Sequence, residues 1–296
     1  MTDVFRTPDE RFEGLPDFDF EPHYREVEGL RLAHLDEGEG PPVVFWHGEP
    51  TWSFLWRHVF PAVRDAGYRC VVPDLVGFGR SDKPTDDEWY SYDRHTALAA
   101  TLLEDLDLWE ATFVVHDWGG PIGLRVAVEH ADRVDRLALM DTGVFTGYQP
   151  MSDAWHTFRE YVAKNPDLDT GFLVRRGCAT DPGDDVARAY DAPFPSADSK
   201  AAARAFPPMI PLSPDDPGAE AGQRTLAALV EDTRPMTILW GQEDGALPPA
   251  TGEALATYLG QEPPRPIEGA GHFLQEDKGQ EIGTLLAEWL ASAAAS

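Results

Sequence analysis

The chain alternates short apolar runs with longer stretches of helical pattern. Three of the runs are rich in β-branched and aromatic residues and contain no polar alternation; they lie at residues 43–46, 69–72 and 112–115. Unbroken runs of this kind are typical of parallel strands buried on both faces. Further strands are predicted at residues 137–140, 236–240 and, more weakly, 266–267, and helices at 96–106 and 122–129. This alternation predicts an α/β fold with a mostly parallel, doubly wound sheet.

The pattern changes between residues 146 and 224. Helical segments are broken there by proline-rich turns, and no strand is evident; the segments lie at residues 153–163, 184–190 and 199–205. An insertion at this point would cover the carboxyl ends of the strands, where ligands bind in open α/β sheets. We therefore predict a core of residues 1–145 and 225–296 and a helical cap of residues 146–224, with the proline-rich run 207–217 leading back to the core.

The charge balance is strongly acidic. The formal net charge is −28, from 52 acidic and 24 basic residues, and only four of the basic residues are lysines. Such a surface repels nucleic acid and anionic lipid, so neither is an expected partner. Because 42% of the residues are hydrophobic, the chain is expected to be globular. Salt would screen its self-repulsion, which suggests a halophilic protein, with an acidic protein of ordinary salt habit as the alternative.

Membrane and metal sites are not expected. No apolar run approaches the roughly 20 residues that span a bilayer, and residues 1–15 lack a basic region followed by an apolar one. We therefore predict a soluble, cytoplasmic protein. The two cysteines, Cys70 and Cys178, have no histidine or cysteine nearby at the spacing of a metal site, so we interpret them as reduced thiols.

Asp117 is the candidate nucleophile. It follows the predicted strand 112–115, and two glycines and an apolar helical pattern come directly after it. This order of strand, sharp turn and helix is that of a nucleophile elbow, with aspartate in place of serine. The elbow usually has glycine two residues before the nucleophile, and this chain has Val115 there. Taken alone, Asp117 would be interpreted as a helix N-cap.

Two later residues complete a triad in the order nucleophile, acid, histidine. Asp244 follows the predicted strand 236–240, and His272 lies in a glycine-rich loop after the last strand. Both are expected at the carboxyl edge of the sheet beside Asp117. An aspartate that displaces a leaving group from a saturated carbon forms an ester, which water can hydrolyse. That hydrolysis needs a general base, His272, and a carboxylate that orients it, Asp244.

Two further positions are predicted to stabilise charge. The oxyanion of the ester intermediate needs backbone N–H donors, and by position these are Glu49 and Trp118. The Trp118 indole N–H donates and cannot accept, which suits a halide leaving group in a dry pocket. Simple apolar packing is the alternative interpretation of Trp118.

Four motifs occur in order along the chain: HGEPTWS at residues 47–53, GFGRSDKP at 77–84, HDWGG at 116–120 and GAGHF at 269–273. With RTPDERF at residues 6–12, the chain resembles the haloalkane dehalogenases over nearly its whole length. The resemblance implies an α/β-hydrolase fold and hydrolysis of a small haloalkane to alcohol and halide, with no cofactor or metal. The acid at Asp244 resembles the subfamily that takes a second halide-binding tryptophan from its cap.

In that subfamily the second tryptophan lies on an early cap helix or shortly after it. The candidates here are Trp155, Phe158 and Phe172. Position favours Phe158, which cannot donate a hydrogen bond. Trp155 lies three residues earlier on the same helical face, so we predict that it takes this role, with simple packing inside the cap as the alternative interpretation.

Two alternative functions stay open at this point. An epoxide hydrolase would use the same aspartate ester but needs tyrosine donors in the cap, for which Tyr148, Tyr161 and Tyr190 are candidates. A non-catalytic scaffold that binds a ligand under the cap would also fit the fold, because folds are reused for many functions. The intact triad and Trp118 beside the nucleophile favour dehalogenation over both.

Overall fold

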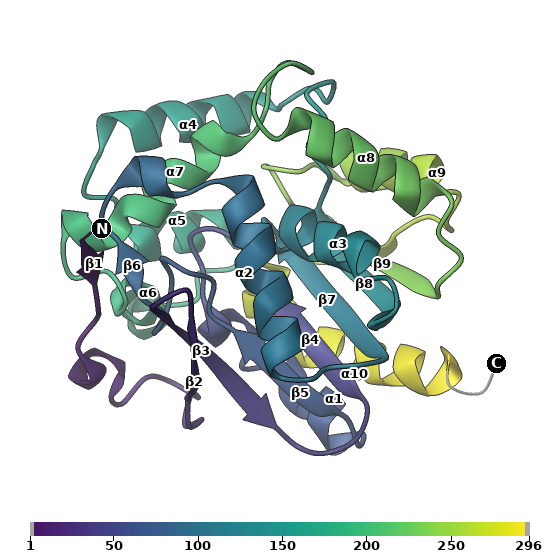
Figure 1. The fold of residues 1–296 in the computed structure, drawn as a ribbon, viewed down its shortest axis with the longest axis horizontal. Helices are drawn as coiled ribbons and strands as arrows, with labels where there is room; N and C mark the ends of the chain where they lie inside the picture. The colour runs from purple at the N-terminus through teal and green to yellow at the C-terminus, as the bar shows by residue number, and fades with distance from the viewer. Residues whose placement is uncertain (1–2, 294–296) are drawn as a thin grey trace.

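The computed structural model describes residues 3–293, and an eight-stranded sheet lies at its centre (Figure 1). From one edge to the other the strands are β10 (Arg265–Ile267), β9 (Met236–Gly241), β8 (Val134–Thr142), β7 (Ala111–Asp117), β4 (Pro42–Trp46), β5 (Arg69–Pro73), β3 (Leu30–Glu37) and β2 (His23–Val27). Neighbours from β10 to β5 are parallel, whereas β3 and β2 are antiparallel. The mostly parallel sheet predicted from the sequence is confirmed.

The antiparallel edge was not predicted from the sequence. In β2 most side chains are exposed, so the strand carries little hydrophobic signal. The hairpin is held instead by a small separate cluster in which Leu30 and Leu32 pack with Val76 and Leu98. A second unpredicted pair, β1 (Val4–Phe5) and β6 (Lys83–Pro84), forms a two-stranded antiparallel sheet.

Helices cover both faces of the main sheet. The core helices are α1 (Phe60–Asp65), α2 (Tyr92–Asp105), α3 (Gly119–Glu129), α8 (Ala219–Val230), α9 (Pro249–Tyr258) and α10 (Leu274–Ala293). The chain crosses from β4 to β5 in one direction and from β7 to β8 in the other. Because such crossovers are right-handed, α1 and α3 lie on opposite faces. Helix α10 packs on α1, and α3 packs between α2 and α8 (Figure 1).

The helices between β8 and α8 gather at the upper left of Figure 1. They are α4 (Asp153–Lys164), α5 (Thr170–Gly177), α6 (Asp184–Asp191) and α7 (Ala201–Met209). Short 3-10 helices complete the secondary structure: η1 (Asp9–Phe12), η2 (Ser53–Trp56), η3 (Asp87–Trp89) and η4 (Ala197–Lys200). The predicted boundary between residues 224 and 225 falls inside α8, which packs against α3. The division into core and cap stays a prediction.

A buried ion pair lies beside α6, and a tyrosine of that helix bonds to it. Arg57 follows η2 and Glu276 lies in the first turn of α10; their side chains are 2% and 3% exposed. The guanidinium makes a second hydrogen bond of 2.7 Å to the same carboxylate. The Tyr190 hydroxyl of α6 donates to Glu276 as well. Charges buried in this way are tolerated because each is paired.

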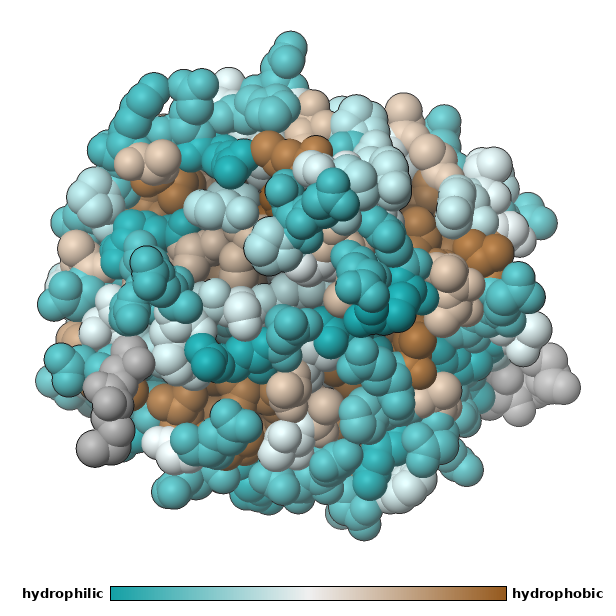
Figure 2. Space-filling view, turned by 45° about the horizontal axis from the view of Figure 1, so that its top comes forward, coloured by the Kyte–Doolittle hydropathy of each residue, from teal (hydrophilic) through white to brown (hydrophobic). Residues whose placement is uncertain are grey.

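The surface is hydrophilic over most of the face drawn in Figure 2, where apolar residues form small separate groups. This agrees with the large excess of acidic residues. Among residues 3–293, no helix is both long enough and apolar enough to cross a bilayer.

Several buried histidines are held in the neutral form. Burial lowers the pKa of His95 to about 3, with smaller contributions from the charges of His47 and Arg94. Burial likewise lowers the pKa of His34 and of His116 to about 4. In the unfolded chain a histidine titrates near pH 6.5, so between that pH and the folded pKa the unfolded state binds more protons. The contribution of these neutral histidines to the free energy of unfolding is therefore fully present above pH 6.5 and is lost as the pH falls toward the folded pKa.

We expect His95→Phe to reduce this acid sensitivity. The ring stacks on Tyr90 and meets the edge of Phe206, contacts that phenylalanine can keep. At pH 5 the wild type should have lost about 2 kcal/mol of its free energy of unfolding through His95, and the variant should not lose this part. Urea unfolding at pH 7 and pH 5 measures the difference. An equal acid loss in both proteins would contradict the prediction.

Candidate active site

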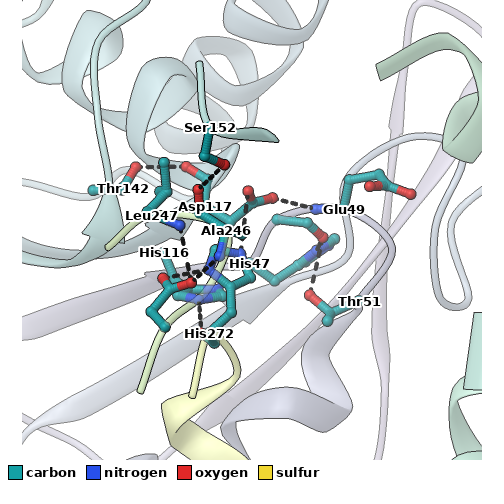
Figure 3. Close-up of polar contacts among 12 residues, drawn as sticks. His47, Glu49, Thr51, His116, Asp117, Thr142, Ser152, Ala246, Leu247 and His272 are labelled. Atoms are coloured by element: carbon teal, nitrogen blue, oxygen red, sulfur yellow. Dashed lines mark hydrogen bonds and ion pairs between the residues drawn. The ribbon is translucent and has the colours of Figure 1, made fainter. Parts of the chain in front are cut away.

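Asp117 ends β7, and α3 begins two residues later at Gly119. Its φ of 48° lies in the left-handed region that few non-glycine residues adopt, as expected at a strained elbow. A Cβ at Gly119 would come within 2.2 Å of the Trp46 carbonyl oxygen, so this position admits only glycine. The Thr142 hydroxyl donates to the Asp117 carbonyl oxygen at 2.6 Å and fixes the turn from the neighbouring strand (Figure 3).

The Asp117 carboxylate is held at one oxygen by the backbone. The Glu49 N–H donates to Oδ1 at 2.8 Å (Figure 3), and the Trp118 N–H is close enough to the carboxylate to lower its pKa. Burial opposes ionisation of Asp117, but hydrogen bonding and charge attraction from His272, with help from the Trp118 N–H, keep its pKa below the ordinary value. The structure thus brings both predicted oxyanion donors to the predicted nucleophile.

His272 lies between the other two predicted triad members. Its Nδ1 is 2.8 Å from Asp244 Oδ2, and its Nε2 is 3.6 Å from Asp117 Oδ2. The other Asp244 oxygen, Oδ1, accepts the backbone N–H groups of Ala246 and Leu247 at 2.7 and 2.9 Å (Figure 3). Asp244 therefore holds the proton of Nδ1 in place and leaves Nε2 facing the nucleophile.

The electrostatics of this triad favour charge on His272. Burial disfavours the imidazolium, but the charge of Asp244 and the hydrogen bond and charge of Asp117 raise the pKa of His272 well above its ordinary value. The histidine is thus strongly basic while both carboxylates are ionised. Removal of either negative charge would lower that basicity.

The loop that carries His272 is fixed from several sides. The His272 N–H donates to the Gly177 carbonyl oxygen at 2.8 Å, and its own carbonyl oxygen lies 2.8 Å from His116 Nε2. Asp277 accepts the Gly271 N–H at 2.9 Å and the Ala179 N–H at 2.8 Å. The end of α5 is therefore bonded directly to the catalytic loop. Sequence reasoning missed the contacts between α5 and this loop because they join residues nearly 100 positions apart.

Trp118 lies beside the nucleophile in an apolar setting. Its side chain is 3% exposed, and its ring packs against Phe145 at 5.2 Å and Phe206 at 5.0 Å between centroids. A small pocket next to it is also lined by Tyr92 and Met209. Within residues 3–293 the indole N–H has no hydrogen-bond acceptor. An unpaired donor in apolar surroundings is suited to a weakly hydrated anion.

The three candidates for the second tryptophan lie in different places. Trp155, in the first turn of α4, is 7% exposed and belongs to the main apolar core, which extends through most of the molecule. Phe158 packs in a separate cluster of the insertion, and Phe172 is 46% exposed. The Ser152 hydroxyl caps α4 and donates to the Ala246 carbonyl oxygen at 3.0 Å (Figure 3), which joins this helix to the Asp244 loop. Of the three, Trp155 has the position that fits the prediction.

Two carboxyl groups beside the triad were missed by sequence reasoning. The Glu49 side chain is buried, and its Oε1 has no hydrogen-bond partner within residues 3–293. Burial, and then the charge of Asp117, raise its pKa well above the ordinary value, so the site disfavours the ionised form of this group. Asp141 is fully buried near the end of β8. An acidic residue directly after the predicted strand 137–140 was the available signal for it.

Metal ligation has no support in the described residues. Among residues 3–293, no three histidine, cysteine or acidic side chains are grouped so that they could hold a metal ion. Cys70 is buried, and burial raises the pKa of its thiol to about 12.

Comparison with known proteins finds relatives that share one enzymatic activity. The model of the alpha/beta hydrolase fold family matches residues 41–279. The haloalkane dehalogenase of Mycobacterium marinum is 41% identical over 299 residues, which covers 97% of this chain and 99% of the relative. That of Psychrobacter cryohalolentis is 36% identical over 305 residues and covers 97% and 98%.

Solved structures agree with these relatives. The tetrameric haloalkane dehalogenase of Paraglaciecola agarilytica NO2 superposes with a TM-score of 0.89 at 36% identity and covers 98% of each chain. The haloalkane dehalogenase of Bradyrhizobium elkani USDA94 has a TM-score of 0.84 at 27% identity, with 94% of this chain and all of the other covered.

Proposed function

Because this chain belongs to the haloalkane dehalogenases of the α/β-hydrolase fold, we propose that it hydrolyses small haloalkanes to alcohol and halide through a covalent alkyl ester of Asp117. The observation that carries the mechanism is the asymmetry of the Asp117 carboxylate. Its Oδ1 accepts the Glu49 N–H at 2.8 Å, while Oδ2 is 3.6 Å from His272 Nε2. One oxygen is thus held in the oxyanion hole, and the other is available for attack.

In the first step, Asp117 Oδ2 attacks the carbon that carries the halogen. The C–O bond forms as the carbon–halogen bond breaks, and the bonding electrons leave with the halide. The reaction needs an ionised carboxylate, which the lowered pKa of Asp117 supplies. Burial and the charge of Asp117 raise the pKa of the nearby Glu49 carboxyl group, which disfavours a second negative charge beside the departing anion.

In the second step, water attacks the ester carbonyl carbon while His272 Nε2 takes its proton. Negative charge develops on Oδ1, which already accepts the Glu49 N–H, and the Trp118 N–H is close enough to the same carboxylate to favour its negative charge. The ester has no negative charge, so the pKa of His272 falls toward that of an effective base when it must accept a proton. As the intermediate collapses, the C–O bond to the alkyl group breaks and the alkoxide takes the proton back from His272 to give the alcohol. The remaining proton of the water leaves the Asp117 carboxyl group for solvent, with His272 as the base, and Asp117 is again a carboxylate.

The halide needs donors at the opposite end of the breaking bond. Trp118 follows the nucleophile directly and offers an indole N–H that is otherwise unpaired within residues 3–293. Trp155 is buried in the first turn of α4, which the Ser152 hydroxyl joins to the Asp244 loop, and it would supply the second donor. Two N–H donors in apolar surroundings stabilise a departing halide more than they stabilise the uncharged substrate, which is the condition for catalysis.

The tyrosines that an epoxide hydrolase would need are engaged elsewhere. Tyr148 is 73% exposed, and the Tyr190 hydroxyl donates to Glu276. Tyr161 packs with Val162 and Leu168 in the separate cluster of the insertion. None of the three hydroxyl groups is positioned to protonate an epoxide oxygen beside Asp117. These positions favour halide as the leaving group.

Halide release from 1,2-dibromoethane and 1-bromobutane tests this function. The assay is run in molar salt and in low salt, beside a diol assay with styrene oxide. We expect halide and alcohol in equal amounts and no diol. Diol without halide would identify an epoxide hydrolase. The absence of product in both assays would favour a ligand-binding scaffold. Full activity and an unchanged melting temperature in low salt would count against the proposed halophilic character; a cytoplasmic location stays a prediction.

Loss of either indole N–H should weaken catalysis. A hydrogen bond to a charged group contributes about 1.5–3 kcal/mol, so Trp118→Phe and Trp155→Phe should each lower kcat/KM for 1,2-dibromoethane by about 10- to 100-fold. Trp109→Phe is the matched control, because Trp109 is 46% exposed and its indole N–H bonds Asp107. Activity unchanged by Trp155→Phe would show that the second donor lies elsewhere.

A further inference from the structure

Asp141 stands between two members of the triad. Strand β8 lies between β7, which ends at Asp117, and β9, which leads into Asp244. The register of β7 and β8 pairs His116 with Met140 and Asp117 with Thr142, so Asp141 is the extra residue of a bulge. Its φ of 34° confirms the local break in the strand. A bulge re-aims a side chain, and here it turns a carboxyl group toward the triad.

Two carboxyl groups meet at this point. The side chains of Asp141 and Asp244 are close enough for a hydrogen bond between them, and the charge of one acts on the other. A hydrogen bond between two carboxyl groups requires a proton, because an ionised carboxylate can only accept. Asp141 is fully buried, so two adjacent negative charges would have no solvent to separate them.

The backbone indicates which group carries the proton. Asp244 accepts N–H groups from Ala246 and Leu247, and it also faces His272 Nδ1 at 2.8 Å. Asp141 accepts the single N–H of Gly241, shared between its oxygens at 3.0 and 3.2 Å. Donors stabilise the ionised form, and Asp244 has three of them. Burial first, and then the charge of Asp244, raise the pKa of Asp141 well above its ordinary value, with only partial compensation from His272 and the Gly241 N–H.

We propose that Asp141 is a neutral carboxylic acid that donates a hydrogen bond to Asp244 and so positions the acid of the triad. This inference rests on the proposed function, in which Asp244 orients His272. Each added donor also makes Asp244 less basic. The charged and titratable groups that face Asp141 are Asp244, after β9, and His272, after β10; Asp117 ends the adjacent strand β7. Without the donor, Asp244 would hold the proton of His272 more tightly.

Two substitutions of Asp141 separate this role from a purely structural one. Asparagine has the same shape; its NH₂ can donate to Asp244 and its oxygen can accept from Gly241, so Asp141→Asn should keep kcat within about threefold of the wild type. Leucine offers neither group, so Asp141→Leu should lower kcat about tenfold or more. In the Asp141→Leu variant, the acidic limb of the pH profile of kcat should also move to higher pH, because His272 becomes more basic.

An infrared difference spectrum tests the proton directly. When the spectrum of Asp141→Asn is subtracted from that of the wild type at pH 7, the difference should show the C=O stretch of a protonated carboxylic acid. Melting temperatures confirm that both proteins are folded. A carboxylate band in its place, with Asp141→Asn as impaired as Asp141→Leu, would overturn the proposal. The infrared readout does not depend on turnover. If the enzyme failed to release halide but kept the band, the proposed function would fall and the neutral Asp141 would stand.

Discussion

Asp117→Asn should reduce halide release by about four orders of magnitude or more, because it removes the nucleophile and leaves the rest of the site in place. The amide is the same size as the carboxylate, and its oxygen can still accept the Glu49 N–H that now bonds Oδ1 at 2.8 Å. The fold should therefore survive. The neutral amide cannot displace a halide, so no ester forms and the later groups have no substrate to act on.

The measurement is initial rate of bromide release from 1,2-dibromoethane. Asp135→Asn is the matched control, because Asp135 is exposed on β8 and touches none of the site residues described above. It should leave the rate unchanged. An intact-mass measurement confirms that the asparagine at position 117 has not reverted by deamidation. Turnover by Asp117→Asn at even one-tenth of the wild-type rate would show that another group attacks the substrate.

The core of the fold could be predicted because its strands are buried on both faces. Runs such as 43–46 and 112–115 contain almost nothing polar, and the structure has β4 and β7 over them. The edge strand β2 has mostly exposed side chains, so its sequence carries no such run. The β2–β3 hairpin packs against a few residues that are distant in the sequence, including Leu98. Edge strands are thus hard to predict from local pattern.

The triad could also be predicted, because each member follows a buried strand at the carboxyl edge of the sheet. The same reasoning should have reached Asp141, which directly follows the predicted strand 137–140. It was missed because the sequence near Asp141 contains no residue that indicates what its carboxyl group contacts. Its meaning appears only when β9 brings Asp244 beside it. Long-range packing, which sequence does not display, decides which of two carboxyl groups is ionised.

The second halide donor shows a different limit. Trp155 and Phe158 lie on the same helix one turn apart, and sequence position alone favoured Phe158. In the structure Phe158 packs with Val162 and Leu168, while Trp155 is buried in the main apolar core. The residue before α4, Ser152, bonds to the Ala246 carbonyl oxygen near Asp244. This contact joins residues 94 positions apart, so local sequence pattern does not reveal it.

His272→Gln should separate the two chemical steps. Asp117 can still attack the haloalkane, since the attacking oxygen and the oxyanion donors are unchanged. Water can no longer lose a proton to Nε2, so hydrolysis should slow by about a thousandfold. We expect one halide per enzyme molecule in a rapid phase and then almost none. The Asp117 peptide should carry the added mass of the alkyl group.

The assay needs alkaline pH. Hydrogen bonding and charge from His272 help to keep the pKa of Asp117 below its ordinary value, and burial opposes this. Without the histidine the pKa of Asp117 rises, so ester formation should weaken as the pH falls and recover as it rises. The double variant Asp117→Asn with His272→Gln is the control and should give neither the rapid phase nor the added mass.

Oxygen isotope incorporation in the wild type gives an independent check of the same ester. In a single turnover in isotopically heavy water, the alcohol should take its oxygen from Asp117 Oδ2, and the water oxygen should remain in the Asp117 carboxylate. A label found in the first alcohol would mean that water attacks the haloalkane directly, with His272 as base and Asp117 in an electrostatic role. In that case His272→Gln should show no rapid phase, so the two experiments must agree.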